Sequence, residues 1–396
     1  MPSDGNGEQV RVAVFVPLFP PARFGGGPIR TLDALTDQQP ERFHSLIFTS
    51  DRDLGESIRL PVRSNQRIEG RGRDKYYASV DGLKTLATGY RVVRNYRPSI
   101  IYLNGFFTPI FSLVPQLLSA LGFFQGAGLV LAPRGEFSPG ALAIRSRKKR
   151  WFLRLFKGLR LHRRVVWHAS SVREMQDIQR EFGARAKVLI RENETRLPES
   201  AELPDGESRG PLRVIFVSRI SEKKGLHRLL ESLCGTSGEI ELSVFGNVED
   251  VDYFKLCEEI ADRLPPSVRY RFRGHLNPDS VRSELVHFDL FAFPTAGENF
   301  GHVIAESLSS SCPVMCADNT PWTEIVRSHG GGVLVGSLKA DEWAEALDVY
   351  SQLSSLERAT RRSDAAKAFE KWRQGQKGRH IFELAHDEFA SAGNDQ

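Results

Sequence analysis

The chain has 396 residues, of which 40% are hydrophobic and 26% charged, and its formal net charge is +5. This is the composition of an ordinary globular protein, and the length is natural for two packed domains. The four cysteines fit reduced thiols better than a disulfide framework. Because Cys312-x3-Cys316 lacks a second pair for zinc, we expect neither a structural metal nor a cofactor.

The first residues give no sign of a secretory signal. Residues 1–9 are polar, and the first apolar run, 12–16, is far too short for a signal peptide, so we expect a cytoplasmic protein. The apolar stretch 106–132 is interrupted by proline, glycine and glutamine. It therefore predicts a strand, a helix and a strand rather than a membrane span.

Apolar runs of strand length alternate with helical patterns along the whole chain. The strands predicted in the first half are 10–16, 46–49, 100–103, 129–132, 165–169 and 188–190, with helices at 29–35 and 113–121 among them. The strands predicted in the second half are 214–217, 240–245, 270–272, 290–293, 314–317 and 333–335, and 226–233 is a helix. This alternation predicts two doubly wound parallel sheets.

A stretch rich in proline, glycine, serine and acidic residues, 199–211, separates the two series and is typical of an exposed linker. We therefore expect a first domain over 1–205 and a second over 206–375. A last helical stretch, 365–389, is broken near 375–378, which makes 376–396 a separate terminal helix.

Three glycines, 25–27, follow the first predicted strand and precede a helix. They match neither the G-x-G-x-x-G pattern of dinucleotide sites nor a P-loop. The loop permits close approach of the backbone to a ligand, with Gly26 and Gly27 as candidate binding residues, and a simple turn is the alternative.

The segment 145–164 has the most unusual charge pattern, because ten of its twenty residues are Lys or Arg. Five apolar residues recur at helical spacing and are expected on one face: Trp151, Phe152, Leu155, Phe156 and Leu159. Such a helix either lies on an anionic membrane surface or packs its aromatic face on the first domain. No nucleic-acid-binding fold accompanies this single patch, so we do not expect nucleic acid as a partner.

Charged residues follow two predicted strands of the second half. Arg219 and Lys224 follow the strand 214–217, and Glu298 and Glu306 follow the strand 290–293. Parallel sheets bind ligands at the carboxyl ends of their strands. Two cations there suit a diphosphate and two carboxylates suit a polyol, so a nucleotide sugar is the first hypothesis. A solvated basic loop and a structural helix carboxylate are the alternatives.

The motifs R-x4-K-G, from Arg219, and E-x7-E, from Glu298, resemble the nucleotide-binding half of retaining glycosyltransferases of family 4, the group 1 glycosyltransferases. The segments 19–30, 49–55 and 132–140 resemble a bacterial polysaccharide-assembly branch. The resemblance implies the GT-B fold, in which two Rossmann-like doubly wound domains face a central cleft. It also implies metal-independent transfer of a sugar, with retained configuration, from a nucleoside diphosphate to a hydroxyl.

The resemblance further implies roles for particular residues. Arg219 and Lys224 would stabilise the departing diphosphate, Glu306 would bind the ribose, and Glu298 would hold the donor sugar with three backbone positions. Those three positions are Asn299, Phe300 and Gly301.

The acceptor side is less defined, because many relatives have a histidine where this chain has Arg134-Gly135-Glu136. Arg134 is a candidate for an acceptor phosphate and Glu136 for orienting a hydroxyl. Asn104 and His168, which also follow strands, are further acceptor candidates. The leading acceptor hypothesis is a polyprenyl-diphosphate-linked sugar, used by a peripheral protein on the inner face of the plasma membrane.

Two other functions remain open. A GT-B sugar-nucleotide epimerase shares the fold but needs groups that abstract and return protons, and R-x4-K-G argues against it. A noncatalytic, membrane-associated nucleotide-sugar-binding protein would bind the donor without turnover. Every charged residue expected of the second-half motif is present, so the hexosyltransferase hypothesis is preferred.

Overall fold

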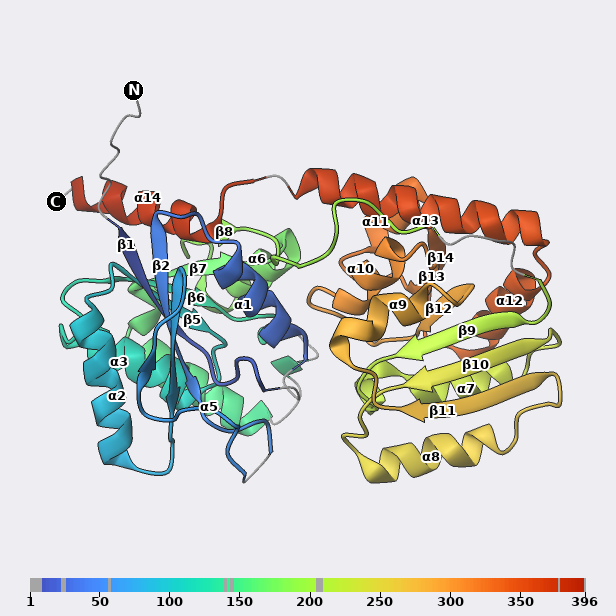
Figure 1. Ribbon diagram of the computed structural model, residues 1–396, viewed down its shortest axis with the longest axis horizontal. Coiled ribbons are helices and arrows are strands. Elements are labelled where there is room, and N and C mark those ends of the chain that lie inside the picture. The colour runs from blue at the N-terminus through green and yellow to red at the C-terminus, as the bar shows by residue number, and fades with distance from the viewer. Residues whose placement is uncertain are drawn as a thin grey trace. The chain divides into compact units, whose positions relative to one another are not determined.

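The computed structural model divides the chain into two compact units (Figure 1). The first unit comprises residues 1–196 together with 378–396, and the second comprises 197–377. The structure describes residues 9–22, 26–55, 58–138, 141–142, 146–203, 209–376 and 378–394. Gly25, Arg145 and the predicted domain boundary at 205/206 lie outside these ranges, and the division into units falls after Arg196.

The first unit is built on an eight-stranded sheet with the order β3-β4-β2-β1-β5-β6-β7-β8. Its strands are β1 (Val10–Phe15), β2 (Phe43–Ser50), β3 (Arg67–Ile68), β4 (Arg73–Ala78), β5 (Ile100–Asn104), β6 (Gly128–Ala132), β7 (Val165–Ala169) and β8 (Val188–Ile190). All neighbouring strands are parallel except the antiparallel edge pair β3 and β4.

Helices cover both faces of this sheet because successive strand residues are apolar on both sides. Val12 and Val14 face a core with α1 (Gly27–Asp37) and α14 (Ile381–Asn394). Ala13 and Phe15 face the opposite core, formed with α2 (Leu83–Tyr96), α3 (Val114–Ala120), α5 (Ser146–Gly158) and α6 (Val172–Phe182). The blue α1 and the red α14 thus belong to one unit although they come from opposite ends of the chain (Figure 1).

The second unit has a six-stranded parallel sheet with the order β11-β10-β9-β12-β13-β14. Its strands are β9 (Leu212–Val217), β10 (Ile240–Phe245), β11 (Val268–Gly274), β12 (Leu290–Phe293), β13 (Val314–Ala317) and β14 (Gly332–Val335). Its helices are α7 (Leu226–Leu233), α8 (Val251–Ala261), α9 (Val281–Leu285), α10 (His302–Ser309), α11 (Thr323–His329), α12 (Ala340–Ser351) and α13 (Ser355–Gly375). One apolar core joins the sheet to these helices.

Both sheets reverse their direction of winding once. The reversal lies between β1 and β5 in the first unit and between β9 and β12 in the second. Ligands of such sheets bind where the loops leave the carboxyl ends of the two central strands. In the second unit these are the loops that carry Arg219, Lys224 and Glu298.

The predicted fold class is confirmed, and every predicted strand coincides with an observed one. The helix 226–233 has the predicted bounds, and the terminal stretch is broken between α13 and α14 near the predicted position. The sequence missed β3 and β4. The strand β4 reads Arg-Asp-Lys-Tyr-Tyr-Ala, and its Asp74 is buried because Arg67 lies 2.5 Å from it in an ion pair.

The basic helix α5 is shorter than predicted, and its apolar residues do not share one face. Phe156 is buried and Phe152 packs against the same core, but the side chain of Trp151 is 65% exposed. Leu153, which was not in the predicted set, is buried as well. The core side of the helix is therefore turned away from Trp151, which lies among exposed arginines.

All four cysteines are free. In the described residues, no helix is both long and apolar enough to cross a membrane. The same residues contain no group of three or more His, Cys, Asp or Glu arranged to hold a metal ion.

Candidate functional site

The two central loops of the second unit are held together through their backbones. Ala296 N donates a hydrogen bond to Lys223 O at 2.9 Å. Gly225 has a φ of +80°, and a Cβ added there would lie 2.2 Å from Pro294 O. Only glycine fits so close an approach, so the glycine of R-x4-K-G brings the two motifs together.

Lys224 and Glu298 meet directly at this point. Lys224 Nζ lies 2.5 Å from Glu298 Oε1, and each side chain is only 12% exposed. Thr295 Oγ1 donates to the same carboxylate oxygen at 2.9 Å, and Lys224 Nζ lies 5.3 Å from the ring centroid of Phe293. The structure therefore joins one residue from each predicted motif into a fixed, poorly solvated ion pair.

Arg219 is held differently. Its Nη1 lies 2.5 Å from Glu249 Oε1, in a pair whose side chains are 47% and 34% exposed. Glu249 belongs to the loop after β10, which is joined to the Arg219 loop by the backbone bond from Ile220 N to Asn247 O at 2.8 Å. The guanidinium is thus near solvent and is paired with a carboxylate that the sequence did not single out.

The backbone after Glu298 turns sharply into α10. Gly301 is the N-cap residue of α10 and has a φ of +80°. Trp322 Nε1 donates to Phe300 O at 2.7 Å, and Phe300 itself is buried. Asn299 lies between these fixed points, and Glu306 lies one turn into α10.

In the first unit, Gly26 and Gly27 stand at the start of α1. Gly26 is the N-cap residue, with a φ of +64°, and Gly27 is the first residue of the helix. A positive φ favours glycine, which accounts for the residue type at position 26.

The acceptor candidates of the first unit form one hydrogen-bond network at the carboxyl ends of β5, β6 and β7. Arg134 Nε donates to Asn104 Oδ1 at 2.7 Å, and Arg134 Nη2 donates to the Tyr102 hydroxyl at 2.7 Å. Arg134 Nη1 donates to Asn193 Oδ1. The Tyr102 hydroxyl lies 2.6 Å from His168 Nδ1. Arg134 therefore contacts Asn104 directly and His168 through Tyr102, so the network contains three predicted residues.

The hydrogen bonds determine the tautomer of His168. Its Nε2 lies 2.8 Å from the carbonyl oxygen of Arg191, which can only accept, so Nε2 carries the proton. Nδ1 then accepts from the Tyr102 hydroxyl. Burial and the charge of Arg134 hold the pKa of His168 well below its usual range. The ring is 1% exposed and neutral, and it is fully hydrogen-bonded within the unit.

Glu136 lies in a neighbouring cluster of the same sheet edge. Its Oε2 accepts hydrogen bonds from Phe106 N at 2.5 Å and Phe107 N at 3.2 Å. Burial raises its pKa to about 7, although both N–H donors act in the opposite direction. A carboxyl group with this pKa can give or take a proton near neutral pH.

Glu174 fixes the loops on either side of this cluster. It accepts from Gly135 N at 2.5 Å, from Ser170 N at 2.7 Å and from Ser170 Oγ at 2.6 Å. The loops after β6 and β7 are thereby tied together beneath Arg134 and Glu136.

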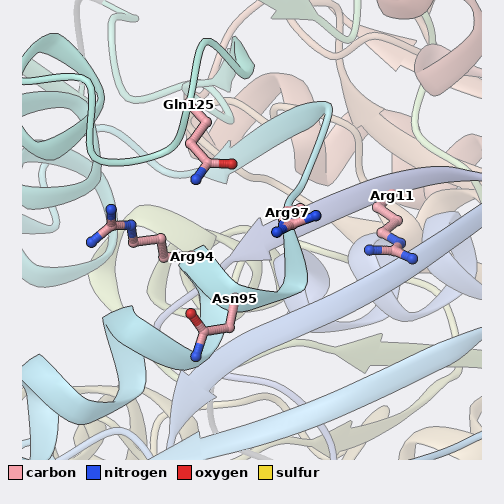
Figure 2. Close-up of a pocket in the computed structure, with 5 residues that line it drawn as sticks. All are labelled: Arg11, Arg94, Asn95, Arg97 and Gln125. Atoms are coloured by element: carbon pink, nitrogen blue, oxygen red, sulfur yellow. The ribbon is translucent and has the colours of Figure 1, made fainter.

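A separate cavity of about 430 Å³ lies in the first unit, beside the amino ends of β1 and β5. Figure 2 shows its lining side chains, Arg11, Arg94, Asn95, Arg97 and Gln125. Arg11 donates to the Tyr96 carbonyl at the end of α2, at 3.1 Å. Because the candidate residues lie at the carboxyl ends of the strands, this cavity is not part of the candidate site.

The sequence did not point to Tyr102, Asn193 or Glu249. Tyr102 lies within a predicted buried strand, so its hydroxyl gave no signal. Asn193 follows β8 in the polar run Arg-Glu-Asn-Glu-Thr, and the strand-end rule that singled out Asn104 would have found it. Glu249 needed the pairing of β9 with β10 to bring it near Arg219.

Known proteins match part of this chain in sequence and nearly all of it in structure. Residues 204–369 match the family described as Glycosyl transferases group 1. The lipopolysaccharide core biosynthesis glycosyltransferase LpsE of Rhizobium meliloti is 29% identical over 143 residues, which are 36% of this chain. The chain spans 40% of the length of that relative.

Solved structures resemble nearly the whole chain. Anabaena HepE, solved in complex with UDP and glucose, has a TM-score of 0.66 at 16% identity and covers 98% of this chain and 100% of its own. Sucrose-phosphate synthase from Thermosynechococcus elongatus has a TM-score of 0.71 at 15% identity, with 98% of each chain covered. At these identities the likeness is one of fold, and the two Rossmann-like units are those of GT-B proteins.

Proposed function

Because residues 204–369 belong to the glycosyl transferases group 1 family, we propose that this protein is a retaining, metal-independent glycosyltransferase. It moves a sugar from a nucleoside-diphosphate donor to a hydroxyl of a lipid-linked glycan acceptor in polysaccharide biosynthesis. The observation that carries the proposal is the Lys224–Glu298 pair, buried where the second sheet reverses its winding. At such a point, where open parallel sheets bind ligands, a cation can bind a diphosphate and a carboxylate can accept hydrogen bonds from the hydroxyls of a sugar.

The donor belongs to the second unit. Lys224 and Arg219 offset the charge that develops on the departing diphosphate, which makes a divalent ion unnecessary. Glu298 and the backbone of Asn299, Phe300 and Gly301 hold the donor sugar, and Glu306 binds the ribose hydroxyls. HepE, which shares the fold, was solved with UDP and glucose, and this supports a nucleoside diphosphate as donor here.

The acceptor belongs to the first unit. Arg134 binds it and Asn104 holds the Arg134 guanidinium, while Glu136, with its pKa near 7, exchanges a proton with the acceptor hydroxyl. Gly26 and Gly27 allow a substrate to approach the backbone before α1. LpsE acts in lipopolysaccharide core biosynthesis, which supports a glycan as the acceptor of this chain.

A membrane-bound acceptor agrees with the distribution of charge. The first unit has 33 Lys and Arg against 21 Asp and Glu, a formal charge of +12, and the second has 21 against 28, a charge of −7. On α5, Arg147 and Arg154 are exposed on either side of Trp151. Exposed cations around an indole favour an anionic lipid surface, at about 1 kcal/mol per basic residue. These charges support the proposal that the protein binds the cytoplasmic face of a membrane.

The donor assignment is tested by calorimetry without metal, using UDP, GDP, ADP and their common sugar conjugates. We expect one nucleotide to bind selectively, and Glu306→Ala and Arg219→Ala to weaken that binding. No binding by any of them would refute both transfer and donor binding. Selective binding of a sugar nucleotide that is never consumed with any acceptor would favour the noncatalytic alternative.

The membrane assignment predicts that Arg147→Gln/Arg150→Gln/Arg154→Gln loses most binding to phosphatidylglycerol vesicles at low salt. Three contributions of about 1 kcal/mol each would lower the affinity by about a hundredfold. The other four tryptophans are at most 7% exposed, so quenching of Trp fluorescence by acrylamide reports mainly on Trp151. Vesicles should protect it from the quencher.

The matched control removes three exposed arginines of the second unit, Arg263→Gln/Arg271→Gln/Arg273→Gln, and changes the net charge equally. It should bind vesicles like the wild type. Equal losses of vesicle binding in both triple variants would show that only the net charge matters. Unchanged vesicle binding in the α5 variant would show that α5 is not the docking helix.

A further inference from the structure

Arg134 is a partly buried cation that is held by neutral partners. Its Nε, Nη1 and Nη2 each donate to one of three neutral oxygens, on Asn104, Asn193 and Tyr102. Within the described parts of the chain, no carboxylate pairs with it at salt-bridge distance. A partly buried charge is normally paired, because losing water costs several kcal/mol unless another charge offsets it. Arg134 therefore has no ion-pair partner, and the buried carboxylate of Glu174 close by is occupied by Gly135 N and by Ser170.

The side chains that hold this cation are themselves almost completely buried. Tyr102 is 0% exposed, His168 1%, Asn193 3% and Asn104 4%. Neutral His168 completes the hydrogen-bond network. Its Nδ1 accepts a hydrogen bond from the Tyr102 hydroxyl, and the oxygen of that hydroxyl accepts one from Arg134. Four buried polar side chains thus fix the position of one guanidinium without neutralising it.

The geometry leaves donors for a ligand. A guanidinium has five N–H groups, and three of them are used within the network. Two neighbouring N–H groups can bind the two oxygens of a phosphate or carboxylate side by side. Arg134 also has a φ of +54°, which is unfavourable for a residue with a side chain and is maintained by the contacts around it.

We propose that Arg134 recognises a phosphate group carried by the acceptor, and that Tyr102, Asn193 and His168 are positioning residues that hold the cation for it. This inference rests on the proposed function and deepens it, since it names an anionic acceptor. The donor motifs lie in the second unit, whereas this cation lies on the strongly basic first unit. The phosphate belongs either to a sugar phosphate or to a lipid diphosphate, and both present the same oxyanion.

The test places a carboxylate where Asn193 has an amide. Asn193→Asp keeps the size of the side chain and gives Arg134 an ion-pair partner. If Arg134 is only structural, this change stabilises the fold and does nothing else. If Arg134 recognises phosphate, the new carboxylate competes with the ligand. We expect an unchanged or higher Tm together with about tenfold weaker phosphate binding.

The probes are glucose 6-phosphate, glucose and inorganic pyrophosphate, measured by calorimetry on Arg219→Ala/Lys224→Ala protein, whose donor site is disabled. Glucose 6-phosphate should bind more tightly than glucose, and adding Arg134→Gln or Asn193→Asp should remove the difference. Tighter binding of glucose 6-phosphate than of pyrophosphate would favour a sugar phosphate as the source. The reverse order would favour a lipid diphosphate.

Several results would overturn the inference while leaving the donor assignment intact. One is phosphate binding that Asn193→Asp does not change. Another is no phosphate binding in protein whose parent still binds nucleotide. If Arg134→Gln weakened nucleotide binding in otherwise wild-type protein, the anion would belong to the donor, and the acceptor assignment would be wrong.

The positioning role has its own readout. Tyr102→Phe removes the oxygen between His168 and Arg134 and leaves the other two contacts of the guanidinium in place. Phosphate binding by Tyr102→Phe should weaken several-fold but persist. Arg134→Lys should not retain the phosphate binding of the wild type, because an ammonium lacks the planar fork of a guanidinium. A lower Tm with unchanged phosphate affinity would make Tyr102 a structural residue only.

Discussion

Lys224→Gln should weaken binding of the donor diphosphate by about ten- to a hundredfold. Two effects add in this variant. The diphosphate loses a cation that is only 12% exposed, and the Glu298 carboxylate, 2.5 Å away in the wild type, is left without its partner and repels the phosphate. Calorimetry with the nucleotide selected by the wild type measures the loss.

The double variant Lys224→Gln/Glu298→Gln separates the two effects. Because it removes the repelling carboxylate, nucleoside diphosphate binding should recover part of the loss, while sugar transfer should not recover. Lys255→Gln is the matched control, since Lys255 lies on α8 of the same unit and its side chain is 69% exposed. It should stay within about threefold of the wild type. Equal effects at both lysines would mean that general basicity, and not the buried pair, binds the donor.

Asp289→Ala should destabilise the second unit by about 3–5 kcal/mol. Asp289 is 0% exposed at the start of β12, where Arg213 Nη2 lies 2.9 Å from it. Arg358 and Arg362, both on α13, lie 3.8 Å and 3.7 Å from it. Removing the carboxylate leaves three guanidinium groups close together with no negative charge between them.

Urea unfolding, followed by tryptophan fluorescence, measures this loss. The matched control is Glu241→Ala, which breaks the Arg269–Glu241 pair between β10 and β11, where the side chains are 68% and 41% exposed. An exposed pair contributes less than about 1 kcal/mol, so the control should unfold nearly as the wild type does. A loss no larger than that of the control would show that Asp289 does not hold α13 to the sheet.

The donor side could be predicted well because its signals are local. Arg219, Lys224 and Glu298 follow strands whose apolar runs are easy to recognise, and strand ends of a parallel sheet meet at one edge. Even so, the sequence did not give their partners. Lys224 pairs with Glu298 across 74 positions, but Arg219 pairs with Glu249 from the loop after β10.

The acceptor side shows more clearly what could not be predicted from the sequence. Asn104, Arg134 and His168 were singled out as acceptor candidates by the same strand-end rule, but the sequence did not indicate how they are connected. In the structure, the hydroxyl of Tyr102 connects Arg134 to His168, and this residue lies inside an apolar strand. A hydroxyl in a buried strand gives no periodic signal, so only its neighbours in space show what it does.

The sequence by itself determined the two doubly wound sheets, the order of most elements and the positions of the charged residues, because apolar periodicity and strand ends are properties of neighbouring residues. Only the tertiary structure decided the rest. It paired β4 with β2 and gave the buried Asp74 of β4 an ion-pair partner in Arg67, and it turned the core side of α5 away from Trp151. Such outcomes depend on charges and surfaces that folding brings together from distant parts of the chain, and no local pattern records them.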